Sequence, residues 1–243
     1  MIRIGILGAA KIAPKAVIGP ASTRTDCEVV AVAARDAERA QAYADEHGIP
    51  HVADSYEALL ARDDIDLIYN ALPPHRHADL TIAALEAGKA VLCEKPFAMN
   101  AGEAARMVEA SARTGQPLIE AFHYRFHPAF QRVLDIVRGG QLGTVRCIEA
   151  AFDVTIPYRP GELRHTLAVG GGALMDLGCY PVHAVRTLIG AEPTVVSATA
   201  HCDHPGVDLR TVAEVAFPGG ETASIHTSMA PDTPFEASIG IAG

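Results

Sequence analysis

The sequence predicts two domains: an α/β domain built on a doubly wound parallel sheet, then an α+β domain with an open, mainly antiparallel sheet. Short apolar runs alternate with helical patterns over the first half of the chain, and this alternation stops near Phe122. Beyond that point, neighbouring apolar runs are joined by a glycine-rich turn. Strands of a parallel sheet are apolar throughout because helices cover both of its faces. We therefore expect one domain over residues 1–122 and a second over residues 123–243.

The first domain is expected to contain five main strands and the helices that connect them. Strands are predicted at residues 2–7, 28–33, 66–71, 90–93 and 117–121, with a short one at 51–53. Helices are predicted at residues 12–22, 36–47, 55–62, 77–87 and 101–114. Gly48, Gly88 and Gly115 follow three of these helices, as expected of residues that end a helix in the left-handed conformation. This order predicts a Rossmann fold, in which ligands bind beyond the carboxyl ends of the strands.

The second domain is expected to combine two helices with a sheet. Helices are predicted at residues 128–138 and 173–188, and strands at 144–153, 195–201, 211–217 and 221–228. The last two strands are joined by a turn at Pro218-Gly219-Gly220. The chain reaches Gly243 inside a further predicted strand, residues 237–242. We therefore expect this sheet to be incomplete, as in a fragment or an unusually short protein.

Composition excludes several classes of protein. The formal net charge of −9 argues against a nucleic-acid partner, because phosphate backbones require a basic surface. The five cysteines are scattered without a CxxC pair, which argues against a disulfide framework and a structural zinc site. We expect His201-Cys202-Asp203-His204 to be a polar turn and no metal to be bound. No basic leader precedes the first strand, and no apolar run approaches the roughly 20 residues of a membrane helix, so a cytoplasmic protein is expected.

A candidate phosphate-binding turn joins the first predicted strand to the first helix. Its sequence is Gly8-Ala9-Ala10-Lys11-Ile12-Ala13, at the place of a GxGxxG fingerprint. The first glycine permits a tight turn, and the start of the helix offers N–H groups to a pyrophosphate. Ala10 replaces the middle glycine, so the turn alone is a weak signal and a purely structural turn is the alternative. Support comes from Arg35, Ala71, Glu94 and Ala121, which also follow predicted strands and would share that edge of the sheet.

The choice between NADP and NAD is expected to depend on Arg35. NAD-binding domains usually carry an acid at the end of the second strand to bind the ribose 2′-hydroxyl. Here Ala34 leaves space, and the planar guanidinium of Arg35 suits a 2′-phosphate. The sequence therefore predicts that NADP is preferred and that NAD is possible. The alternative is a solvated Arg35, with Asp36 capping the next helix.

Several motifs in order resemble the Gfo/Idh/MocA oxidoreductase family. Residues 84–89 and Glu94-Lys95-Pro96 resemble the family as a whole. Residues 120–128 and 170–181 resemble its branch that contains dimeric dihydrodiol dehydrogenase and NADP-dependent D-xylose dehydrogenase. The resemblance implies hydride transfer at a carbon of a sugar, polyol or dihydrodiol. It implies that Lys95 lies near the nicotinamide and the reacting hydroxyl, and that the Lys95-Pro96 bond is cis. It also implies a longer chain in most relatives and dimers formed through the sheet of the second domain.

The motif over residues 176–183 contains Asp176, Tyr180 and His183, which are spaced i, i+4 and i+7. On a helix these positions share one face, although Pro181 fits only near a helix start or at a kink. In the resembling branch the tyrosine is the general acid/base, and a nearby cation would stabilise its phenolate. Asp176 would orient the substrate or tune Lys95 and Tyr180. The alternative is that Tyr180 is an ordinary half-buried helix residue.

Weaker candidates surround these two motifs. Asn70, Pro73, His75 and His77 match a segment that passes close to the cofactor in the resembling family. Candidate cofactor contacts in this segment are Ala71, Leu72, Pro73 and His77. His77 has an alternative role in capping or packing the next helix. His123, Arg125 and His183 are candidate substrate-binding residues, and Arg125 has an alternative role in joining the domains.

Two other functions remain open at this stage. Some relatives are glycoside hydrolases that hold the dinucleotide tightly, and the fold also serves non-catalytic dinucleotide-sensing regulators. The presence of Lys95, Asp176 and Tyr180 argues against a regulator, because a sensor does not need a proton donor beside the nicotinamide.

Overall fold

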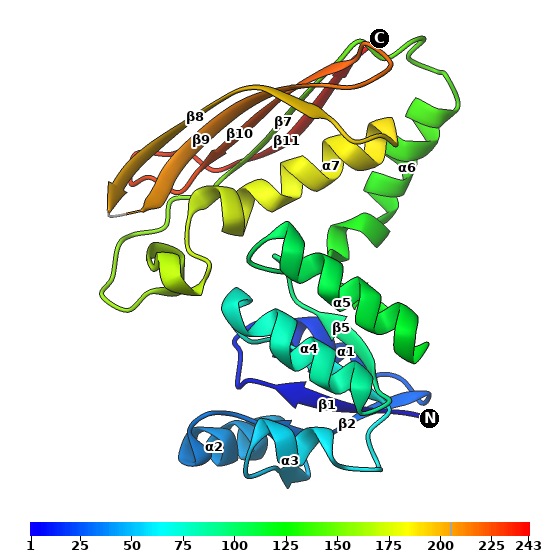
Figure 1. Ribbon diagram of the computed structural model, residues 1–243, viewed down its shortest axis with the longest axis vertical. Helices are drawn as coiled ribbons and strands as arrows, with labels where there is room; N and C mark the ends of the chain where they lie inside the picture. The colour runs from blue at the N-terminus through cyan, green and yellow to red at the C-terminus, as the bar shows by residue number, and fades with distance from the viewer. Residues whose placement is uncertain (205) are drawn as a thin grey trace. The chain divides into compact units, whose positions relative to one another are not determined.

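The computed structural model describes residues 1–204 and 206–243, which form two compact units, Met1–Ala121 and Phe122–Gly243 (Figure 1). Each unit has its own sheet and its own two clusters of buried hydrophobic residues. The first carries the parallel sheet and the second the open sheet, as the sequence predicts.

The first unit is a six-stranded parallel sheet in the order β3-β2-β1-β4-β5-β6. Its strands are β1 (Ile2–Leu7), β2 (Cys27–Ala33), β3 (His51–Val52), β4 (Leu67–Asn70), β5 (Ala90–Cys93) and β6 (Leu118–Glu120). Strand β1 pairs with both β2 and β4, so the order of the strands reverses beside β1. That reversal is the switch point at which doubly wound sheets bind their ligands. The Rossmann expectation is confirmed.

Helices cover both faces of this sheet. They are α1 (Gly19–Ser22), α2 (Ala37–His47), α3 (Tyr56–Leu60), α4 (His77–Glu86) and α5 (Ala101–Thr114), with short turns η1 (Pro14–Ile18) and η2 (Pro74–Arg76). Neighbouring strand residues belong to different cores: Leu7 and Ile68 to one, Ile6 and Tyr69 to the other. Such alternation is the consequence of side chains pointing to opposite faces of a strand. The strands are therefore apolar on both sides.

The second unit is a five-stranded mixed sheet in the order β11-β7-β10-β9-β8. Its strands are β7 (Cys147–Asp153), β8 (Thr194–His204), β9 (Val207–Ala216), β10 (Thr222–Ser228) and β11 (Glu236–Ala242). Only the β7–β10 pair is parallel. The helical elements are η3 (His123–Phe126), α6 (Pro128–Arg138), η4 (Leu163–His165), η5 (Leu167–Val169), η6 (Leu174–Gly178) and α7 (Cys179–Ile189). Helices α6 and α7 pack on one face of the sheet, where Phe130, Leu134 and Val185 meet Ile148 and Ile225 (Figure 1).

Three local expectations are corrected. The strand predicted to end at residue 201 continues to His204, so Cys202 pairs with Asp208 of β9 instead of lying in a turn. The side chain of His204 lies outside the described residues. The helices predicted at 12–22 and 173–188 both begin with a π-helical turn, η1 and η6. Pro181 is the third residue of α7, directly beyond such a turn, where a missing N–H costs little.

The described residues lack two further features, a membrane-spanning helix and a cluster of metal ligands. No helix there is long and apolar enough to cross a membrane. Within the same residues, histidine, cysteine and carboxylate side chains do not gather in groups of three or more that could hold a metal.

Candidate functional site

The residues that follow the strands of the first unit form one hydrogen-bonded edge. Backbone bonds run from Gly8 to Ala33 (2.8 Å), from Ala71 to Leu7 (3.1 Å), from Glu94 to Asn70 (2.9 Å) and from Ala121 to Cys93 (2.7 Å). Each bond joins the residue just beyond one strand to the end of its neighbour. The candidates chosen for their position at strand ends therefore lie on the same edge, and Gly8 lies at its switch point.

The phosphate-binding turn depends on Gly8 and on two residues of α2. Gly8 has a φ of +96°, and an added Cβ would lie 3.0 Å from the Leu72 side chain. The Arg39 guanidinium donates to the Ala9 carbonyl at 2.8 Å, and the Tyr43 hydroxyl donates to the Ala10 carbonyl at 3.0 Å. Because N–H and C=O of a trans peptide point in opposite directions, the Tyr43 bond aims the next N–H away from α2. Burial, aided by the charge of Glu46, raises the pKa of Tyr43 to about 12, so the phenol stays a donor.

Arg35, the candidate residue for binding a 2′-phosphate, lies at the surface. The Arg35 side chain is exposed, and among residues 1–204 and 206–243 neither a carboxylate nor a hydrogen bond holds it. Asp36 caps α2, because its carboxylate accepts the Arg39 N–H at 2.8 Å. The alternative role for Asp36 is thus confirmed, while Arg35 keeps its guanidinium available. Lys11 and Ile12 are likewise exposed beside the turn.

Lys95 follows β5 and is held through its backbone. The Tyr69 hydroxyl donates to Oε1 of Glu94 at 2.6 Å, and the Lys95 N–H donates to Oε2 of the same carboxylate at 3.2 Å. Tyr69 is fully buried, and burial together with the Glu94 charge raises the pKa of its phenol. The Lys95-Pro96 bond is cis, as the resemblance implied.

His77 links the loops after β4 and β5. Its ring is fully buried, with Nε2 2.6 Å from the Leu72 carbonyl and Nδ1 2.9 Å from the Pro96 carbonyl. Burial lowers the pKa of His77, so the neutral ring donates to one of these carbonyls. The side-chain amide of Asn70, also buried, donates hydrogen bonds to the Thr81 hydroxyl and to the His77 carbonyl. Without exposed surface, His77 fits the packing role left open above, and it positions Leu72 and Pro96.

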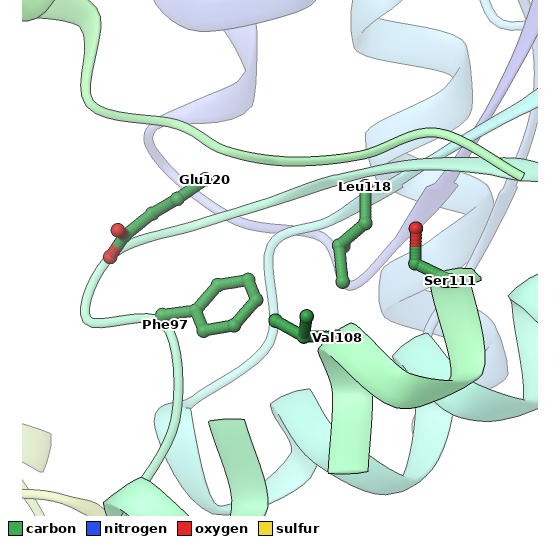
Figure 2. Close-up of a pocket in the computed structure, with 5 residues that line it drawn as sticks. All are labelled: Phe97, Val108, Ser111, Leu118 and Glu120. Carbon is green, nitrogen blue, oxygen red and sulfur yellow. The ribbon is translucent and has the colours of Figure 1, made fainter. Parts of the chain in front are cut away.

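A small cavity of about 200 Å³ lies between α5 and β6 (Figure 2). Phe97, Val108 and Leu118 supply its apolar wall, and Ser111 and Glu120 complete the lining. In Figure 2 the Phe97 ring points toward Val108, while the Glu120 carboxylate points away from the apolar side chains. None of the predicted cofactor residues lines this cavity, so we assign no chemistry to it.

In the second unit, Tyr180 lies in a cluster of aromatic rings. Its ring centroid is 5.0 Å from Phe152 and 5.2 Å from Phe122, both edge-on, and 5.7 Å from Tyr124. His123 contacts the same ring at 6.3 Å. Edge-to-face contacts at these distances fix the orientation of a ring. The candidate acid/base is therefore held by packing against several elements.

His183 belongs to the same cluster. Its ring stacks on Phe122 at 4.5 Å, and its Nδ1 lies 2.6 Å from the Tyr124 hydroxyl. Burial, followed by the positive charge of Arg125, lowers the pKa of His183 to about 4. The ring is therefore neutral near pH 7, and Nδ1 accepts the hydrogen of Tyr124. Arg125 is half-buried and His123 is exposed.

Asp176 forms an ion pair with Arg164, which lies in the short helical turn η4. Arg164 Nε donates to its carboxylate at 2.7 Å, and Arg164 Nη1 donates to Glu162 at 2.8 Å. Burial opposes the charge on Arg164, but the two carboxylates outweigh burial and raise its pKa. Asp176 is therefore one half of an ion pair.

Sequence reasoning missed four residues that hold the candidates in place: Arg39, Tyr43, Tyr69 and Arg164. Only one pattern pointed to any of them. Arg39 and Tyr43 are four residues apart, so they share the face of α2 next to the turn.

Two family models match the chain. The model described as an oxidoreductase family with an NAD-binding Rossmann fold covers residues 2–122. The model described as the GFO/IDH/MocA C-terminal domain covers residues 130–243.

Individual relatives agree with these matches. The D-xylose 1-dehydrogenase (NADP(+)) 2 of Haloferax volcanii is 41% identical over 230 residues, which are 95% of this chain and 70% of that protein. The trans-1,2-dihydrobenzene-1,2-diol dehydrogenase of Xenopus tropicalis is 35% identical over 97% of this chain and 71% of its own length. The crystal structure of KijD10, a 3-ketoreductase of Actinomadura kijaniata in complex with NADP and TDP-benzene, superposes with a TM-score of 0.91 at 32% identity. That match covers 100% of this chain and 74% of KijD10.

Proposed function

This chain belongs to the Gfo/Idh/MocA family of NAD(P)-dependent oxidoreductases, and from that premise we propose that it is an NADP-dependent dehydrogenase or reductase. Its reaction would take place at a secondary alcohol or hemiacetal carbon of a sugar, polyol or dihydrodiol. Relatives named for D-xylose and for dihydrobenzenediol support this substrate class. The observation that carries the proposal is the hydrogen-bonded edge at the switch point, which gathers Gly8, Ala71 and Glu94.

The residues of this edge fit a dinucleotide. The turn at Gly8 has no Cβ, which would meet Leu72, and Arg39 and Tyr43 hold the carbonyls of Ala9 and Ala10. Candidate contacts with the cofactor are Gly8, Ala9, Ala10, Lys11, Ile12, Ala71, Leu72, Pro73, Glu94 and Lys95. Arg35 would pair with a 2′-phosphate, because its guanidinium is exposed and has five donors in a planar fork. A bound nicotinamide supplies the site at which hydride is accepted or released.

The protein's own residues would handle the proton. We assign the general acid/base to Tyr180, whose ring is fixed by Phe122 and Phe152. Lys95 would act as the cation that stabilises the phenolate and the substrate oxygen. Asp176, paired with Arg164, would accept hydrogen bonds from substrate hydroxyls while staying ionised. His123, Arg125 and His183 are further candidates for substrate contacts.

We also propose a homodimer and a cytoplasmic location. The face of the second sheet opposite α6 and α7 carries small side chains such as Ala151 and Ser224 together with the polar side chains of Glu149, His226 and Glu236, and these residues line a groove of about 420 Å³. A second copy of that face would cover it, as in the dimeric branch of the family. All five cysteines are free thiols, which suits a reducing compartment.

A spectrophotometric panel tests the function. Aldoses, polyols and dihydrodiols are offered with NADP and with NAD, and reduced nicotinamide is followed by its absorbance. Turnover of at least one substrate, faster with NADP, is expected. Nucleotide binding without turnover of any substrate would favour a sensor, and release of sugar from glycosides without net reduction would favour a hydrolase.

A further inference from the structure

Arg164 connects two carboxylates that the sequence places 14 residues apart, Glu162 and Asp176. It donates from its backbone N–H to Glu162 Oε2 at 2.6 Å, from Nη1 to Glu162 Oε1 at 2.8 Å, and from Nε to Asp176 Oδ2 at 2.7 Å. Charge-assisted bonds of this length are about twice as strong as neutral ones. The Asp176 side chain is 17% exposed, so it is better shielded than partners in ordinary surface pairs.

Backbone hydrogen bonds join the segment around Arg164 to the residues that precede η6, the helical turn that contains Asp176. The Arg164 carbonyl accepts the Gly172 N–H at 2.9 Å, and the Thr166 carbonyl accepts the Gly171 N–H at 3.0 Å. An added Cβ on Gly171 would lie 2.7 Å from both the Arg164 carbonyl and the Thr166 nitrogen. Only glycine therefore allows the two backbones to approach so closely, and this approach brings the guanidinium within reach of Asp176.

The start of the segment is also fixed by β9. Asp208 accepts the Leu174 N–H at 2.9 Å and the Thr211 hydroxyl at 2.6 Å. The backbone beneath Asp176 is thus held by the sheet, while its side chain is held by the loop. From Asp176 the chain continues through η6 into α7, which carries Tyr180.

We infer that Arg164 is a positioning residue, which orients the Asp176 carboxylate toward the substrate and keeps it from acting as the base. This inference rests on the proposed function. Asp176 has two oxygens, and the Arg164 bond to Oδ2 restrains the rotation of the carboxylate. A misplaced contact of about 1 Å can reduce a rate by about a hundredfold. Loss of Arg164 would remove this restraint on the carboxylate.

Kinetics of single and double variants test the inference on the intact chain, with a substrate identified in the panel. Arg164→Gln is expected to lower kcat per folded enzyme by about 10- to 100-fold, with the KM for NADP within about twofold of the wild type. Arg164→Lys should recover part of kcat, because one ammonium satisfies one carboxylate at a time. The double variant Arg164→Gln/Asp176→Asn should be no slower than Asp176→Asn alone, since both changes remove one interaction.

Arg186→Gln is the matched control. Arg186 is 45% exposed against 46% for Arg164, lies in the same unit, and is also ion-paired, with two of its nitrogens donating to the single carboxylate of Glu192. The control should keep the wild-type kcat. Equal kcat values for the two glutamine variants, or additive losses in the double variant, would overturn the inference.

A measurement without turnover separates this inference from the proposed function. The Nε–H of Arg164 is followed by nitrogen–proton NMR, and its signal should be protected in the wild type and in Arg186→Gln but lost in Asp176→Ala. An Arg164 Nε–H signal that stays protected when Asp176 is replaced counts against the inference. Lack of turnover with an intact, Asp176-dependent signal counts against the proposed function instead.

Discussion

The phenol of Tyr69 donates a 2.6 Å hydrogen bond to Glu94, across the neighbouring strands β4 and β5. Because Tyr69 is fully buried, its hydroxyl needs a partner, and the carboxylate at the end of β5 is that partner. The same carboxylate accepts the Lys95 N–H. A buried residue of the first unit, Tyr69, therefore helps to fix the backbone position of Lys95 through the Glu94 carboxylate.

Replacing Arg35 with alanine is expected to weaken the use of NADP. The kcat/KM for NADP should fall by about 10- to 100-fold, because a charge-assisted bond to phosphate contributes about 1.5–3 kcal/mol, while the value for NAD should change little. Steady-state kinetics with both nucleotides measure this. Arg24→Ala, at another exposed arginine, serves as the control. A wild-type protein that already prefers NAD would contradict the prediction.

Replacing Tyr180 with phenylalanine should remove the proton donor and keep the ring. The aromatic contacts with Phe122 and Phe152 do not need the hydroxyl, so the fold should survive. The expected loss in kcat is about 10²- to 10⁴-fold, with NADP affinity unchanged. Turnover and nucleotide fluorescence titration measure the two quantities. Tyr56→Phe is the control, and an unchanged kcat in the Tyr180 variant would exclude the acid/base role.

Replacing His77 with alanine is expected to destabilise the first unit. The change leaves the Leu72 and Pro96 carbonyls without the ring and opens a cavity, which together cost about 2–4 kcal/mol. Urea unfolding measures the free energy of unfolding. His75→Ala removes an exposed ring and should cost little. If the two alanine variants were equally stable, the positioning role of His77 would be wrong.

Stability should fall in mild acid because of His183. Its pKa is about 4 in the folded chain, below the value of 6.5 in the unfolded chain. Between these values the unfolded chain binds a proton that the folded chain does not, so unfolding becomes more favourable as pH falls. Urea unfolding at several pH values should show a shallower decline between pH 6.5 and 4 in His183→Asn than in the wild type. Identical slopes would contradict the assigned shift.

Local signals predicted much of the fold. The helices Ala101–Thr114 and Pro128–Arg138 begin and end where expected, because Gly115 ends the first in the left-handed conformation and Pro128 starts the second. Strand β5 was also predicted with its observed bounds. Where no glycine, proline or cap marks an end, prediction was poorer. Strand β8 runs three residues further than expected, since pairing with β9 continues through Cys202.

The sequence by itself determined the doubly wound sheet, the candidates at its strand ends and the motif that contains Asp176 and Tyr180, because periodicity and turn residues act over a few positions. Tertiary structure alone decided which side chains hold those candidates. Arg39 and Tyr43 reach the turn from α2, Tyr69 reaches Glu94 from β4, and Arg164 reaches Asp176 from a loop. Such contacts require segments distant in sequence to lie side by side. One example is the close approach of the Arg164 carbonyl to Gly171, where a Cβ would not fit. No pattern within a few residues of the sequence encodes such an approach.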